Sequence, residues 1–258
     1  MVAQGAVAAA FVALYAWQDG MHQSNDGRRY TSGKPQPPPF SRRFCGWPLK
    51  VLKWTSLVCL VALGAAMPSW QATVALMALP GAWFVATHPT TVDAPAMLCA
   101  WLGSQLMPSH PVLGVLLSAA GGFVHERAPV FCALYAWSPW PLLGLAASGW
   151  WRKPAERDGD VLVGDTSLLG TIRAHKPYVD WLDGRVHLLH LRGLWLVAAT
   201  APSPQVLATT AVALASRLVG TDGGRFLLWA GPALAAAMPA DVPLWVLALH
   251  VLTFRRCI

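Results

Sequence analysis

Charged residues are scarce in this sequence. Only 12% of its 258 residues are Asp, Glu, Lys or Arg, and 55% are hydrophobic. A soluble domain carries about 25% charged residues. A water-soluble protein of this composition would expose apolar patches large enough to cause aggregation. Because the chain also has 14 tryptophans, 22 glycines and 21 prolines, which suit interrupted helices with aromatic belts, we expect a polytopic membrane protein.

Several functional signatures are missing as well. The five cysteines form no CxxC pair, so neither a disulfide framework nor a zinc site is indicated. The HxxH formed by His187 and His190 is too weak a pattern to predict a metal, and we expect no cofactor. No Walker A loop, Rossmann glycine fingerprint, GxSxG elbow or aromatic-interleaved basic face is present. A nucleotide donor and a nucleic-acid partner are therefore not expected, and any donor substrate comes from the membrane.

The apolar stretches predict an all-α transmembrane bundle of about eight to ten segments, some short or broken, since a spanning helix needs about 20 largely apolar residues. The first apolar stretch, residues 2–17, lacks a basic n-region and a cleavage site, so we expect a retained helix and not a signal peptide. We expect an N-terminal transmembrane module at 1–149 with a polar loop at 18–50, a polar segment at 150–187, and a C-terminal transmembrane module at 188–258. The candidate spans are 2–17, 51–67, 70–87, 94–107, 111–124, 128–149, 188–200, 204–219, 225–239 and 241–254.

The net charge of +7 does not settle the orientation. Residues 18–53 and 150–192 carry seven Lys and Arg each, although they face opposite sides if the first six spans all cross. Basic loops are normally cytoplasmic. One of these two loops therefore breaks the rule, and function is the expected reason.

Three polar clusters fall on one face by the same count: "NDGRRY", "THPTTVDAP" and "VHERAP". Polar residues at helix ends inside a membrane bundle are costly, which makes them functional candidates. Each also has a structural explanation. Asn-Asp-Gly is a strong turn sequence, Thr91 or Asp93 suits a helix N-cap, and Glu126 with Arg127 suits a lock between helices. Arg225 later in the chain suits snorkelling to the interface.

In this order the clusters resemble the class C (GT-C) integral membrane glycosyltransferases, which take sugars from polyprenyl phosphates. Asp26 and Tyr30 are similar to the acidic residue and Tyr of their first extracytoplasmic loop. Asp93 in "TVDAP" resembles the start of a later helix in that superfamily. "PPPFSRRF" and "TDGGRFLLWAGP" resemble a membrane re-entry segment and a late Asp/Arg pair. The hairpin that ends in "HER.P" supplies the remaining matches, Glu126, Arg127 and Pro129.

The resemblance implies a multi-pass enzyme of the cell (inner) membrane whose active face is extracytoplasmic. Its partners would be the bilayer, a polyprenyl-phosphate-linked sugar, and an acceptor that is a glycan, lipid or protein. Asp26 would be the general base, and Asp93 or Glu126 would orient the acceptor. The basic loop at 18–50 would lie outside because it receives an anionic donor. The polar segment at 150–187 would then be cytoplasmic, where its basic residues fit. The substrate-binding residues implied are Arg28, Arg29, Tyr30, Arg43, His88, His125, Arg127, Asp222 and Arg225.

Two other classes of function fit the same sequence. A transporter or flippase-like protein for an anionic lipid would also use broken helices and intramembrane charges. A subunit of a larger membrane complex would use the polar clusters only to join helices. An Asp26→Asn substitution separates the three, since it should abolish transfer in an enzyme, leave lipid binding in a flippase and change little in a scaffold.

Overall fold

The computed structural model describes residues 2–19, 49–87, 93–148, 194–216 and 227–239, with 241–243, 245, 247 and 248. Every regular element within these residues is helical, and they contain no strand. The all-α expectation is therefore confirmed for the part of the chain that is described.

The first group of helices is built from the N-terminal apolar stretches. Ser69 caps α5 by accepting a hydrogen bond from the amide of Ala72 at 3.1 Å, which is the usual role of a serine at that position. Pro80 is the first residue of α6, where its missing amide hydrogen costs nothing. The group consists of α1 (Val2–Asp19), α4 (Leu49–Ala65), α5 (Trp70–Met77) and α6 (Pro80–Thr87).

The second group forms a hairpin and its extension. α8 begins at a proline, and α9 ends at Trp137, which adopts the left-handed conformation (φ 50°, ψ 46°). Few residues other than glycine adopt this conformation, which ends the helix at its C-cap. The elements are α7 (Asp93–Leu106), α8 (Pro111–Val124), α9 (Arg127–Ala136), the 3₁₀-helix η1 (Trp140–Gly144) and α10 (Leu145–Ser148).

The third group comes from residues 194–236, toward the C-terminus. Ser203 caps α14 by accepting from the amide of Val206 at 3.2 Å, and Pro204 follows as the first helical residue. The helices are α13 (Leu194–Thr200), α14 (Pro204–Ala215) and α16 (Gly231–Ala236).

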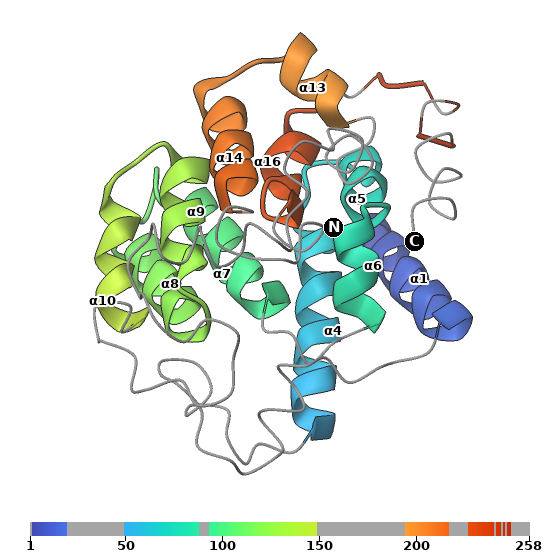
Figure 1. Ribbon diagram of the computed structural model, residues 1–258, viewed down its shortest axis with the longest axis horizontal. Coiled ribbons are helices and arrows are strands. Elements are labelled where there is room, and N and C mark those ends of the chain that lie inside the picture. Colours follow the sequence, from blue (N-terminus) through green and yellow to red (C-terminus); the bar gives the residue numbers. More distant parts are fainter. Residues whose placement is uncertain are drawn as a thin grey trace, which may run out of the picture.

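Helix α7 lies at the centre of the arrangement (Figure 1). It packs against α8 and α9 on one side and α4 on the other, while α1 packs on α4, α5 and α6. The C-terminal helices join both groups, because α14 contacts α9 and α16 contacts α5. One hydrophobic core, which contains Leu60, Leu76, Met97, Phe131 and Trp229, runs through all three groups.

Small residues allow the close packing of α8 on its neighbours. A Cβ added to Gly114 would lie 2.9 Å from the carbonyl oxygen of Gly103 in α7. A Cβ on Gly122 would lie 2.6 Å from the carbonyl oxygen of Gly144 in η1. The backbones therefore touch at these crossings, and a glycine is required on α8.

The structure divides two of the predicted spans. The apolar stretch at 70–87 is two helices, because the chain turns at 78–79 ahead of Pro80. The stretch at 128–149 is α9, η1 and α10, because Trp137, Pro139 and Pro141 interrupt it. The expectation of one helix in each of these stretches was wrong. Among the described helices, none combines the length and the apolar character that crossing a bilayer requires.

Candidate functional site

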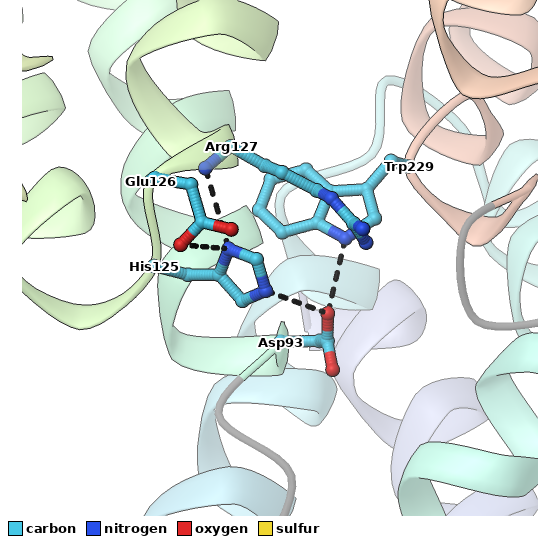
Figure 2. A network of polar contacts seen from close by, with 5 residues as sticks. All are labelled: Asp93, His125, Glu126, Arg127 and Trp229. Carbon is cyan, nitrogen blue, oxygen red and sulfur yellow. Dashed lines mark hydrogen bonds and ion pairs between the residues drawn. The ribbon is translucent and has the colours of Figure 1, made fainter. Parts of the chain in front are cut away.

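Charge in the described part of the chain is concentrated at one place. Of the 19 basic and 12 acidic residues of the sequence, the described residues include only Asp19, Lys50, Lys53, Asp93, Glu126, Arg127 and Asp241. The cluster formed by Asp93, His125, Glu126, Arg127 and Trp229 holds three of these seven (Figure 2). Asp93 and His125 are also the only acidic or basic side chains that are buried among the described residues.

Two buried threonines show how a hydroxyl can be satisfied within its own helix. The hydroxyls of Thr87 and Thr210 donate to carbonyls four residues earlier, at 3.0 and 2.7 Å. A carboxylate or an imidazole has no comparable bond available within its helix, so its partners come from elsewhere. Burial of an ionisable group is costly unless such partners are provided.

Asp93 is the first residue of α7 and its side chain is fully buried. The N-terminus of a helix carries a partial positive charge, which stabilises a carboxylate in its first turn. Pro95 is also in this turn, where a proline is well tolerated. The sequence thus places an acidic side chain at a helix start that faces the protein interior.

His125 and Glu126 form the corner between α8 and α9. α8 ends at Val124, and His125 follows as its C-cap, with an extended backbone (φ −151°, ψ 129°) that donates its N–H to the carbonyl oxygen of Gly121 at 2.7 Å. α9 then begins at Arg127, so only two residues separate the helices. The corner is tight because Gly121 lies against Ala128, where an added Cβ would be 2.7 Å from the Cβ of Ala128.

The imidazole of His125 lies between the two carboxylates (Figure 2). Its Nε2 is 3.9 Å from Oδ1 of Asp93, and its Nδ1 is 3.5 Å from Oε2 of Glu126. The backbone N–H of Arg127 donates to the same Nδ1 at 3.3 Å. Asp93 comes from α7, whereas His125 and Glu126 come from the corner between α8 and α9. Tertiary packing therefore brings Asp93 to His125.

The ring has a polar partner on each side in either protonation state. As the neutral imidazole, it accepts from Arg127 at Nδ1 and directs Nε2–H toward Asp93. As the imidazolium, Nδ1–H faces Oε2 of Glu126, a buried oxygen that has no hydrogen-bond partner among the described residues. Protonation at Nδ1 thus exchanges the bond from the Arg127 N–H for one to Glu126, and an imidazole with a polar partner in both states is suited to acid–base chemistry.

Trp229 is the fifth member of the cluster and was not predicted. Its indole Nε1–H donates to Oδ1 of Asp93 at 3.1 Å, although 136 positions separate the two in sequence. Its ring lies 5.6 Å from the His125 ring and 5.1 Å from that of Phe131, centroid to centroid. Its carbonyl oxygen accepts from the hydroxyl of Tyr135 in α9.

The predicted site residues divide into two sets. Asp93, His125, Glu126 and Arg127 are described. The structure places His125 within ion-pair distance of Asp93, which comes from a sequence-distant element, and of its neighbour Glu126. The others lie outside the described residues: Asp26, Arg28, Arg29, Tyr30, Arg43, His88, Asp222 and Arg225. Within the described ranges, no group of three His, Cys, Asp or Glu is placed to hold a metal ion.

Comparison with known proteins gives no family for the chain. No family model, no curated protein and no solved structure matches it.

Proposed function

We propose that the chain is a membrane-embedded glycosyltransferase that moves a sugar from a polyprenyl-phosphate donor to an acceptor, with Asp93, His125 and Glu126 in its catalytic centre. The observation that carries the proposal is the buried carboxylate of Asp93 facing His125, in a protein whose described exterior is largely apolar.

The surface of α8 supports the membrane part of the proposal. Its buried face consists of Gly114, Ser118, Gly121 and Gly122, whereas its exposed face carries large apolar side chains. Helices of water-soluble proteins show the reverse distribution. Small residues between helices and large apolar residues outside are typical of packing in lipid. The exposed side chains are Val112, Leu113, Leu116 and Phe123.

Exposed tryptophans also support a membrane location. Six of them are exposed among the described residues. Tryptophan is enriched where a protein meets the headgroup region, because its ring is apolar and its N–H is polar. Short helices interrupted by proline are tolerated in membranes where neighbouring protein covers the backbone. The six are Trp17, Trp54, Trp70, Trp137, Trp140 and Trp245.

The cluster supports the enzymatic part. An ionisable pair buried in an otherwise apolar protein costs stability, and retaining it suggests a chemical role. The resemblance to the GT-C enzymes suggests what each residue does in that reaction. Asp26 removes the proton of the acceptor hydroxyl, Asp93 or Glu126 orients the acceptor, and Arg127 holds the phosphate of the donor. The acceptor oxygen forms a bond to the anomeric carbon, and the phosphate leaves with the electron pair of the broken bond.

A transfer assay tests the proposal. The purified chain in lipid vesicles is given polyprenyl phosphate that carries a radiolabelled hexose or pentose, with a membrane extract as the source of acceptor. We expect release of polyprenyl phosphate and transfer of the label. Asp93→Asn should lower the rate by at least about 100-fold, since it removes a catalytic-centre carboxylate with little change in size.

Asp241→Asn is the matched control, because it makes the same change at an exposed aspartate. Its rate should stay within about twofold of the unmodified chain. Equal rates for the two variants would contradict the proposal. Movement of the labelled lipid across the bilayer without cleavage would replace it with the transporter alternative.

A further inference from the structure

We propose that Trp229 is a positioning residue for the Asp93 carboxylate, so that the C-terminal module completes the candidate site. The inference rests on the proposed function for its effect on turnover. The contact itself is independent of that function, because a buried indole N–H donates to a buried carboxylate oxygen at 3.1 Å.

The geometry favours a bond to the ionised form of Asp93. The indole is a donor only, so it can satisfy a carboxylate oxygen but cannot accept a proton from a protonated acid. Hydrogen bonds to a charged acceptor are roughly twice as strong as those between neutral groups. Because Oδ1 is also the oxygen nearest to His125, at 3.9 Å, Trp229 fixes the oxygen that faces the imidazole.

Trp229 is itself held in place from three directions. The hydroxyl of Tyr135 donates to its carbonyl oxygen, the Phe131 ring packs on one side, and the His125 ring packs nearby. Its side chain is fully buried. A donor that is fixed in this way loses little entropy when it binds the carboxylate, so it can hold Asp93 in one rotamer.

A second buried tryptophan provides a matched control. The indole Nε1–H of Trp101 donates to the carbonyl oxygen of Ala66 at 3.2 Å, and its ring packs edge-on against Tyr135. Replacing either tryptophan by phenylalanine removes one indole hydrogen bond and keeps an aromatic ring. Only the change at Trp229 leaves the Asp93 carboxylate without its indole donor.

Steady-state kinetics on the full chain in vesicles give the first test. Trp229→Phe should lower kcat by about 10- to 100-fold and leave KM for the polyprenyl-phosphate sugar unchanged, because Trp229 acts through Asp93 and not on the donor. Trp101→Phe should keep both constants within about twofold. A Trp229→Phe enzyme with unchanged kcat, beside an inactive Asp93→Asn enzyme, would overturn this inference and leave the proposed function standing.

A spectroscopic test separates the inference from the function. The indole N–H resonance of Trp229 is assigned in the ¹⁵N-tryptophan-labelled chain as the signal that Trp229→Phe removes. It should shift upfield in Asp93→Asn, since a neutral acceptor binds the N–H more weakly. Asp93→Glu provides a second variant, which keeps the charge and displaces the oxygen. A resonance that is unchanged in both variants would overturn the inference, whatever the transfer assay shows.

Discussion

Glu126 differs from Asp93 in its exposure to solvent. The side chain of Glu126 is 31% exposed, while that of Asp93 is fully buried. Water screens an exposed charge more strongly than a buried one. An exposed ion pair therefore contributes little to stability, whereas a buried pair is costly to break. His125, with 9% of its side chain exposed, lies between them in both position and burial.

These differences predict how strongly three conservative substitutions affect turnover. Turnover should fall most in Asp93→Asn, less in His125→Gln and least in Glu126→Gln, with a loss below about tenfold for the last. The measurement is kcat for the three purified variants in the same vesicles. A Glu126→Gln enzyme as impaired as Asp93→Asn would show that burial does not set the importance of these side chains.

Helix α8 requires glycines where it crosses neighbouring elements. Its glycines touch backbone on neighbouring elements, so size and not backbone conformation demands them. An alanine at Gly122 would place its Cβ 2.6 Å from the carbonyl oxygen of Gly144 and 2.7 Å from Cγ of Pro129. Neither backbone nor a proline ring can move aside easily.

We therefore expect Gly122→Ala to destabilise the protein by about 1–3 kcal/mol, which is typical of overpacking. The control is Gly5→Ala in α1, where the nearest atom to the new Cβ would be the Ala65 Cβ at 3.6 Å, an ordinary contact. Circular dichroism during thermal unfolding in detergent should show a lower midpoint for Gly122→Ala and no decrease for Gly5→Ala. Equal midpoints would mean that α8 does not pack as described.

Local sequence predicts some helix boundaries and not others. "MPSW", "MPSHP" and "APSP" predicted breaks, and helices end at Ala65, Leu106 and Thr200 beside them. The breaks at 78–79 and at Trp137 carry weaker local signals inside apolar runs. Whether such a run continues as one helix depends on what packs against it, and that information is not local.

Local sequence also predicts only part of the candidate site. Asp93, His125 and Glu126 are polar groups between apolar stretches, and the sequence alone predicts them as site candidates. Trp229 gave none, because one tryptophan among 14 in an apolar segment is equally consistent with an interfacial belt. Its bond to Asp93 depends on the packing of the C-terminal helices against the rest, and no spacing rule encodes it.

Across the whole molecule, the described helices expose large apolar side chains, whereas the carboxylate of Asp93 is buried. Leu116 on α8 is 58% exposed and Trp54 on α4 is 64% exposed, while Asp93 has no exposed surface. In water this distribution would drive aggregation. In a bilayer it is favourable, because the hydrocarbon solvates the large side chains and the buried groups find partners inside.

The most direct test of this account is the environment of Leu116. A nitroxide spin label is attached at that position after the native cysteines are replaced, and a second chain carries the label at Ser109, in the exposed turn between α7 and α8. Both are reconstituted in vesicles, and collisions with oxygen and with a water-soluble nickel chelate are compared. We expect the label at Leu116 to meet oxygen and to be shielded from nickel, relative to the label at Ser109. Equal access of nickel to both labels would show that α8 faces water, and the membrane-embedded glycosyltransferase would then be untenable.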